Sequence, residues 1–576
     1  MFKNLKKGLS TLLLSCLLVS NLFTLQVNGQ QKNVTPKPTV TAKKVTLKNT
    51  PAKPANKQPV QNPNQAKNVI IFLGDGMGVS HTTLARLYKG SNLYMDEIAT
   101  GLVKTYCYNS IITDSAPAAT AMATGYKSND GYISVYPSEI NYPSLQSVNE
   151  KDAYKPLATV LEAAKLKNKA TGIVSTSQVS HASPAGFTAH VPNRNQYFEI
   201  AKQQVYQNLN VVFGGGKKYL LPGEKGRQDG LNLIDELKKM NYQFVEDTKS
   251  MKSANGEKIW GIFADDAMSH DIDRDPEKEP SLAEMTRKAI ELLSKDKDGF
   301  FLFVEGSEID WASHANDPKG VISDVLAYDE AIKVALDFAK KDKNTLIIAA
   351  ADHDNGGLSI GNKKTDSTYT TLKANTLLDP LKKATLTGVG VESKLNPERD
   401  NIVEVMRDYY GITDLTAEEI EAIKKAPAGK LNYVIGPMLS SRSVIGWTTN
   451  GHTGSDTVLY AYGPGKPSGV IDNTDIAKIA AKAMGISLND VNADLFVELE
   501  EGLTYLPNAE AELDVTDMAN PVLIITKGKI VAELPISTNI IKINGKVKYL
   551  NGLTILAKNE RIYLPIQALD IIFEAK

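Results

Sequence analysis

The chain has 576 residues, and its 65 lysine and arginine residues nearly balance its 66 aspartate and glutamate residues. This length exceeds that of one ordinary domain, and the near-neutral charge excludes a strongly basic nucleic-acid-binding protein. Two cysteines exclude a disulfide scaffold, whereas a hydrophobic fraction of 42% is sufficient for a soluble globular fold.

Residues 1–29 are predicted to be a secretory signal peptide. A lysine-rich start precedes a mostly apolar stretch, residues 9–27, which polar residues interrupt and which is short for a membrane span. Cys16 follows a weak lipoprotein-like sequence, but the apolar residues after it favour a place inside the signal peptide. We therefore expect a secreted or surface-associated protein, with lipoprotein anchoring as the less favoured alternative.

Residues 30–67 contain eight lysines, six prolines, and no acidic or aromatic residue. This composition cannot bury a core and predicts a disordered Lys/Pro-rich linker. A flexible spacer is the favoured interpretation, and a cationic tether to the cell wall or to anionic lipid headgroups is the alternative. Residues 68–576 then hold 54 basic against 66 acidic residues, so the part expected to fold is acidic.

From residue 68 onwards, short apolar runs typical of buried strands alternate with segments of helical periodicity. The runs cover residues 68–73, 170–175, 211–213, 300–304, 345–351 and 458–462. The predicted helices cover residues 155–168, 282–295 and 329–341, and Ser281 with Glu284 forms a capping box for the second of them. This alternation predicts an α/β fold with a central, mainly parallel sheet between helical layers.

Polar residues directly after these runs are candidates for a binding site, because ligands gather at the carboxyl ends of parallel strands. Asp75 lies between glycines after the first run, Glu305 ends the fourth, and Asp352 and His353 follow the fifth. Carboxylate and imidazole groups suit a metal site, although the Asp-His pair would also suit a catalytic dyad, and Asp75 alone could cap a helix.

Three further motifs add candidate groups. Ser115 precedes a run of small residues, so it is either a helix N-cap or a nucleophile that the helix dipole favours. Asp310 and His314 share one face if their segment is helical, a spacing that also arises by chance, and His452 could complete their cation site. Arg194 could hold two phosphate oxygens with its planar fork, or could lie on the surface.

In combination these motifs resemble the bacterial alkaline phosphatases. The matching sequences, in order, are NVIIFLGDGMG, TDSAPAATAMATG, HASPAGFTAHVPNR, VEGSEIDWASHAND, AADHDNGG and GWTTNGHTG. The resemblance covers about residues 68–487, leaves residues 488–504 as a linker, and implies a metal-dependent phosphomonoesterase that works through a phosphoserine intermediate. Homodimers are common in this family.

The resemblance also implies a role for each motif residue. Ser115 would be the nucleophile, and Arg194, oriented by Asp114, would bind the phosphate. The ligands of a first zinc would be Asp310, His314 and His452. Those of a second zinc would be Asp75, Asp352 and His353. A third metal, usually Mg²⁺, would be held by Asp75, Ser183 and Glu305.

Two positions near the implied phosphate site depart from several well-known family members. His181 replaces an aspartate, which weakens support for Mg²⁺ and could draw zinc to the third site. Trp311 replaces a lysine, which removes a positive charge beside the phosphate. Both residues are expected to line the substrate site.

Residues 505–576 change to short alternating strands, predicted at 522–526, 529–532, 540–543 and 546–550, with a final strand and short helix. Asn544-Gly545 is a strong hairpin signal, and Asn551-Gly552 is a second candidate. This small α+β region resembles the copper amine oxidase N-terminal-like domain, which implies a surface-attachment or stabilising role and no copper.

Two other functions compete with the phosphomonoesterase. A phosphodiesterase, sulfatase or phosphomutase of the same superfamily would usually differ around the nucleophile and the phosphate-binding arginine. A surface-binding protein with an inactive core would lack metal ligands, whereas every expected zinc ligand is present in this sequence.

Overall fold

The computed structural model describes residues 64–142 and 148–575. The predicted signal peptide and nearly all of the predicted linker therefore lie outside the described residues. Among the described residues, no helix combines the length and the apolar character that crossing a membrane requires.

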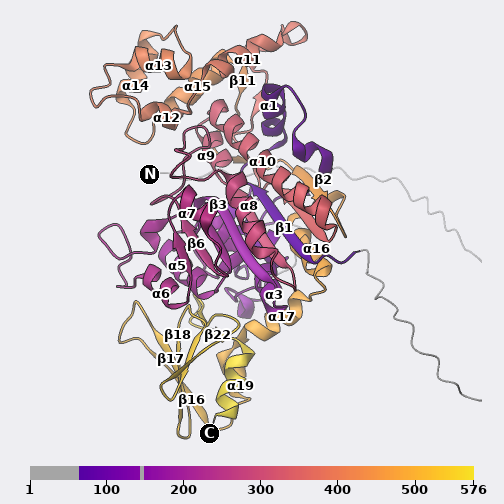
Figure 1. The fold of residues 1–576 in the computed structure, drawn as a ribbon, viewed down its shortest axis with the longest axis vertical. Helices are drawn as coiled ribbons and strands as arrows, with labels where there is room; N and C mark the ends of the chain where they lie inside the picture. The colour runs from indigo at the N-terminus through magenta and orange to yellow at the C-terminus, as the bar shows by residue number, and fades with distance from the viewer. Residues whose placement is uncertain (1–63, 143–147, 576) are drawn as a thin grey trace, which may run out of the picture. The chain divides into compact units, whose positions relative to one another are not determined.

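A ten-stranded sheet forms the centre of the chain (Figure 1). Its spatial order is β14-β2-β13-β8-β1-β7-β3-β4-β6-β5, and all neighbouring pairs are parallel except the two that involve β13. The strands are β1 (Asn68–Gly74), β2 (Ala99–Lys104), β3 (Ala170–Gln178), β4 (Val211–Gly215), β5 (Gln243–Val245), β6 (Ile259–Ile262), β7 (Phe300–Gly306), β8 (Thr345–Ala350), β13 (Thr457–Tyr462) and β14 (Gly469–Asp472). The predicted mainly parallel sheet is confirmed.

Helices cover both faces of this sheet, because its central strands are buried on both sides. In β1, Ile70 and Phe72 join one apolar cluster, whereas Val69, Ile71 and Leu73 join another on the opposite face. The first face is covered by α8 (Leu282–Leu293) and α10 (Pro318–Asp342), which lie over the strands in Figure 1. The second is covered by α2 (Ser115–Thr124), α3 (Val160–Leu166) and α16 (Asn473–Ala483).

Capping residues explain where several helices begin. Ser281 and Glu284 form the expected capping box before α8. The helix expected at residues 155–168 begins only at Val160, because Thr159 forms its own capping box with Glu162. The helix expected at residues 329–341 is the end of α10, which starts after the cap Asp317.

Residues 361–444 form a helical insertion that the sequence patterns did not indicate. It leaves the body after β10 (Ser359–Ile360) and returns at β11 (Ile445–Gly446), and these two strands pair with each other. Its helices are α11 (Ala374–Lys383), α12 (Gly388–Glu392), α13 (Ile402–Tyr410), α14 (Ala417–Lys425) and α15 (Asn432–Arg442). Asp317 anchors it by accepting hydrogen bonds from the Gly388 amide (2.7 Å) and the Tyr410 hydroxyl (2.8 Å).

The C-terminal region contains a five-stranded antiparallel sheet, followed by α19 (Ile566–Glu574). Its strands are β16 (Ala509–Asp514), β17 (Val522–Lys527), β18 (Ile530–Pro535), β19 (Ile540–Ile543) and β20 (Lys546–Tyr549). The Asn544-Gly545 hairpin between β19 and β20 is confirmed, and both turn residues have positive φ (45° and 82°).

Two expectations for this end of the chain differ from the structure. Asn551-Gly552 does not form a hairpin with β20, because β21 (Ile555–Leu556) pairs with β22 (Ile562–Leu564) instead. Residues 488–504, expected as a linker, contain α17 (Leu488–Leu495), β15 (Val497–Glu498) and α18 (Leu499–Leu503), and β15 also pairs with β22. This segment therefore pairs and packs with the C-terminal sheets through its strand β15 and its apolar side chains.

Candidate active site

Three neighbouring strands bring the predicted metal ligands together. β8, β1 and β7 are adjacent and parallel, so their carboxyl ends meet at one edge of the sheet. Asp75 follows β1, Glu305 lies within β7 opposite Leu73, and Asp352 follows β8. All three side chains are almost fully buried.

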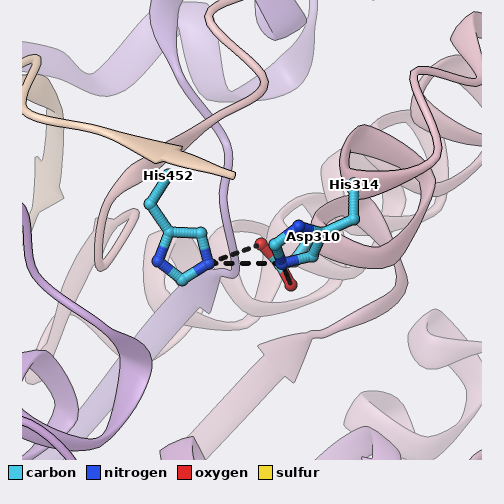
Figure 2. A group of neighbouring side chains, drawn as sticks. All are labelled: Asp310, His314 and His452. Atoms are coloured by element: carbon cyan, nitrogen blue, oxygen red, sulfur yellow. Dashed lines mark hydrogen bonds and ion pairs between the residues drawn. The ribbon is translucent and has the colours of Figure 1, made fainter. Parts of the chain in front are cut away.

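The first group of potential ligands consists of Asp310, His314 and His452. Asp310 and His314 lie one turn apart on α9 (Glu308–His314), and Figure 2 shows His452 approaching them from a separate strand. The Nε2 atom of His314 is 3.2 Å from Oδ2 of Asp310, and Nε2 of His452 is 3.6 Å from Oδ1 of Asp310. Three donor atoms thus converge on one point, as a bound cation requires.

Backbone carbonyls orient both imidazole rings of this group. Nδ1 of His314 donates to the carbonyl of Asn450 (2.5 Å), and Nδ1 of His452 donates to the carbonyl of Thr113 (3.0 Å). These hydrogen bonds leave each Nε2 atom facing the centre, which is the usual arrangement of metal-binding histidines.

The second group consists of Asp75, Asp352 and His353. Nε2 of His353 lies 3.6 Å from Oδ1 of Asp75 and 3.2 Å from Oδ2 of Asp352. The Gly76 amide donates to the other Asp352 oxygen (3.1 Å), which fixes the direction of that carboxylate. The hydroxyl of Ser115 lies 3.2 Å from the same His353 nitrogen, so the predicted nucleophile adjoins this group.

The third group consists of Asp75, His181 and Glu305. The sequence placed His181 in the substrate site and suggested that it could draw zinc to the third site, and the structure groups it with these two carboxylates. Ser183 lies on α4 (Ala182–Thr188), two residues after His181, and its side chain is fully buried. Ser175 donates to one Glu305 oxygen (2.6 Å), leaving the other available.

Several buried atoms of these groups have no hydrogen-bond partner among the described residues. They are Oδ1 of Asp75, Nδ1 of His181, Oγ of Ser183, Oε1 of Glu305 and Oδ2 of Asp352. Leaving such atoms unpaired is costly, and each is a suitable ligand for a divalent cation. The donor set thus fits resident metal ions, with imidazole and carboxylate suiting zinc and an oxygen-rich set suiting magnesium.

The electrostatics of the site support the same interpretation. Burial and the charge of Asp352 raise the pKa of Asp75 well above its usual value. Burial and the charge of Asp310 raise the pKa of Asp352 to about 6. Burial and the charge of His452 lower the pKa of His353 to about 3, so its ring is neutral and able to bind a metal. Crowded carboxylates beside neutral imidazoles are stabilised by added cations.

The phosphate-binding candidates lie next to the metal groups. Ser115 begins α2, and Gly125 ends this helix in the left-handed conformation. Arg194 donates through Nη1 to Asp114, and its Nη2 lies 3.0 Å from Nε2 of His181. Asp114, Arg194, His314 and His452 line an open pocket of about 760 Å³. The Trp311 ring packs edge-on against His181, with ring centres 5.7 Å apart.

The structure adds a supporting residue that the sequence reasoning did not select. Asn355 donates from Nδ2 to Oδ1 (2.6 Å) and to the backbone carbonyl (3.0 Å) of Asp310. It directly follows the Asp352-His353-Asp354 motif, so proximity in sequence was an available signal. By contrast, His190 pairs with Glu162 (3.0 Å) and contacts Phe496, so it packs outside the metal groups.

The site combines a buried serine at a helix N-terminus, an arginine that can bind an oxyanion, and converging ligands for cations. This combination is typical of metal-assisted phosphate-ester hydrolases. The comparisons with known proteins narrow this class. The alkaline phosphatase family model matches residues 66–486, and the chain belongs to that family. It is therefore a metal-binding phosphomonoesterase.

Three relatives match this chain over nearly their whole length. Alkaline phosphatase 3 of Bacillus subtilis is 40% identical over 454 residues, which cover 74% of this chain and 92% of the relative. The crystal structure of a cold-active alkaline phosphatase from Shewanella sp. is 30% identical, with a TM-score of 0.63, and covers 72% of this chain and 99% of its own. The Thermus thermophilus enzyme is 26% identical, with a TM-score of 0.66, and covers 76% and 96%.

Proposed function

We propose that this chain hydrolyses phosphate monoesters through a phosphoserine intermediate on Ser115. The observation that carries the proposal is the position of its hydroxyl, 3.2 Å from Nε2 of His353 and at the N-terminus of the ten-residue helix α2. Amide dipoles at that end stabilise both an alkoxide and the incoming phosphate. Phosphomonoesters carry nearly two negative charges at neutral pH. A protein with an acidic folded part can bind them only where local positive charge balances these charges.

Asp310, His314 and His452 would hold one zinc ion, and Asp75, Asp352 and His353 a second. When bound, such cations neutralise phosphate charge and favour the deprotonated forms of the serine hydroxyl and of water. The orphaned buried atoms described above support this assignment.

The chain's own residues then account for binding and transfer. Arg194 grips two phosphate oxygens, and Asp114 holds the guanidinium in place. The Ser115 oxygen attacks phosphorus, the ester oxygen leaves with the alcohol, and a phosphoserine forms. Water then attacks phosphorus, the Ser115 oxygen leaves, and inorganic phosphate is released. Two in-line displacements predict net retention of configuration at phosphorus.

By family resemblance, Asp75, Glu305 and Ser183 would hold Mg²⁺ at the third site. His181 groups with the two carboxylates and could change this preference. A histidine-to-aspartate mutant of the alkaline phosphatase from the Antarctic bacterium TAB5 has Mg bound in its M3 site. An imidazole ligand favours zinc over Mg²⁺. The side chain at position 181 should therefore decide which of these metals the third site prefers.

The test is hydrolysis of p-nitrophenyl phosphate by the full chain, with and without a chelator, beside Ser115→Ala. We expect chelation to abolish activity, zinc and magnesium to restore it, and Ser115→Ala to lower kcat by about 10³-fold or more. Ser441→Ala, which changes an exposed serine bonded to Lys364, is the matched control. Full activity of Ser115→Ala would overturn the mechanism.

We further propose that the protein is secreted through residues 1–29 and that residues 505–576 form a copper amine oxidase N-terminal-like domain that serves attachment or stability. The absence of histidine and cysteine from residues 505–576 supports a role without copper. N-terminal sequencing of protein recovered from the culture medium tests secretion, and an intact start at Met1 would contradict it. Homodimer formation stays a prediction that sedimentation can test.

A further inference from the structure

A second cavity, of about 540 Å³, lies on the flank of α9 beside the metal ligands. Asp310 and His314 share one face of this helix, while Glu308 and Trp311, three residues apart, share the neighbouring face and line the cavity. Trp311 also packs against His181, so its ring contacts both this cavity and a residue expected at the phosphate site.

The outer wall of the cavity comes from the helical insertion. Val389 belongs to α12, Lys394 follows it, Lys430 precedes α15, and Tyr433 lies in α15.

Two contacts fix this wall against the catalytic body. Asp317 binds the Gly388 amide and the Tyr410 hydroxyl, as described above. Asp273 accepts hydrogen bonds from the amide (3.0 Å) and the hydroxyl of Thr387, directly before α12. A Cβ atom on Gly390 would lie 2.4 Å from the Asp273 carboxylate, so the insertion approaches the body closely here. The cavity is therefore held by specific contacts on both sides.

The charged groups of the cavity differ between floor and rim. On the floor, Nδ1 of His270 lies 2.6 Å from Asp324 and 3.5 Å from Glu308, so both buried carboxylates already share a partner. On the rim, neither Lys394 nor Lys430 has a carboxylate partner within residues 64–142 and 148–575. Their Nζ atoms lie over the rings of Tyr409 (5.7 Å) and Tyr433 (4.9 Å), respectively. The rim thus offers two exposed ammonium groups that no carboxylate neutralises, and Trp311 and the Tyr433 ring beside Lys430 add aromatic surface.

We propose that this cavity is a leaving-group subsite for phosphate monoesters whose alcohol part carries a planar ring and a second anionic group. The ring contacts Trp311 and Tyr433, and the anionic group lies near Lys394 and Lys430. A volume of about 540 Å³ lies in the range of sites that hold ring-sized ligands. The inference rests on the proposed phosphomonoesterase function and adds a substrate class to it.

The test compares three aryl phosphates with one scaffold: phenyl phosphate, 4-carboxyphenyl phosphate and the cationic 4-(aminomethyl)phenyl phosphate. For the metal-loaded full chain, kcat/KM reports all steps up to phosphoryl transfer. The variant is the double substitution Lys394→Gln/Lys430→Gln. Its control, Lys382→Gln/Lys424→Gln, removes two exposed charges of the same insertion that do not line the cavity.

We expect the ratio of kcat/KM for the carboxylate probe to that for phenyl phosphate to fall about tenfold in the rim variant and to stay within about twofold in the control. The ratio for the cationic probe should rise. Dividing each ratio by that of the unsubstituted protein cancels differences in leaving-group reactivity.

Tyr433→Leu separates aromatic contact from charge. It should lower kcat/KM for phenyl phosphate relative to ethyl phosphate by about fivefold. Unchanged probe ratios in the rim variant, with phenyl phosphate hydrolysed normally, would overturn the subsite while the phosphomonoesterase stands. A wild-type chain that hydrolyses no monoester would overturn the proposed function itself.

Discussion

The Nε2 atoms of His314 and His452 lie 3.3 Å apart, although the two residues are separated by 138 positions in the sequence. Each ring is turned toward the other by a backbone carbonyl, of Asn450 and Thr113 respectively. While both rings are neutral and donate through Nδ1, each Nε2 atom carries a lone pair, so neither can donate a hydrogen bond to the other or to the Asp310 carboxylate. A cation between them resolves this conflict, since it can accept all three lone pairs at once.

Substitution of one of these rings should therefore remove one metal ion rather than unfold the chain. We expect His452→Ala to lower the zinc content by about one ion per chain and kcat/KM by about 100-fold or more, because one of the three donors is lost. Metal analysis after gel filtration measures the first quantity. His190→Gln, which changes a buried histidine outside the site, should keep its full zinc content, and equal zinc loss in both variants would contradict the assignment.

Arg194→Lys should separate charge from geometry at the phosphate site. Lysine keeps the positive charge but cannot hold two oxygens or keep the hydrogen bond that Arg194 makes with Asp114 in the same plane. We expect KM and the inhibition constant of inorganic phosphate to rise about tenfold or more, with zinc content unchanged. An unchanged inhibition constant would show that Arg194 does not bind the phosphate.

The sequence was most informative where local chemistry decides the structure. The short, continuous apolar runs of β1, β7 and β8 favoured buried strands, so Asp75, Glu305 and Asp352 were correctly expected at their carboxyl ends. The position of Ser115 at a helix N-terminus followed equally from the small residues up to Gly125.

Features that depend on distant partners were not predictable. The carbonyls of Thr113 and Asn450 orient the site histidines, yet any residue has a carbonyl, so no residue type marks them. The helical insertion depends on the pairing of β10 with β11, which neither strand indicates alone. No motif marks His270, and its buried imidazole is paired with Asp324, 54 positions away in α10.

The residue at position 181 should decide which metal occupies the third site. His181 lies within ligand distance of Asp75 and Glu305, and its Nδ1 atom has no hydrogen-bond partner among the described residues. We expect His181→Asp to raise the magnesium content toward one ion per chain and to make activity more dependent on Mg²⁺, because Mg²⁺ prefers oxygen ligands. Dialysis against equal zinc and magnesium, followed by metal analysis, measures the shift, and identical contents in both proteins would contradict it.

The buried pair of His270 and Asp324 should make stability decline in alkaline solution. Burial opposes the charged form of His270, but the carboxylates of Asp324 and Glu308 outweigh it and raise the pKa of His270 to about 10. The unfolded value is about 6.5, so the folded chain holds this proton more tightly. The stabilisation is therefore complete below about pH 6.5 and is lost as the pH rises toward 10, by at most about 1.4 kcal/mol per pH unit.

His270→Gln isolates this contribution, because it removes the titrating ring and keeps a polar side chain. Urea midpoints of metal-saturated protein should differ most between wild type and variant near pH 6.5 and converge toward pH 10. Lys382→Gln, an exposed change, should follow the wild-type profile throughout. A difference that stays constant from pH 6.5 to 10 would show that His270 stabilises the fold by packing alone, without the proton that its two carboxylate partners hold in place.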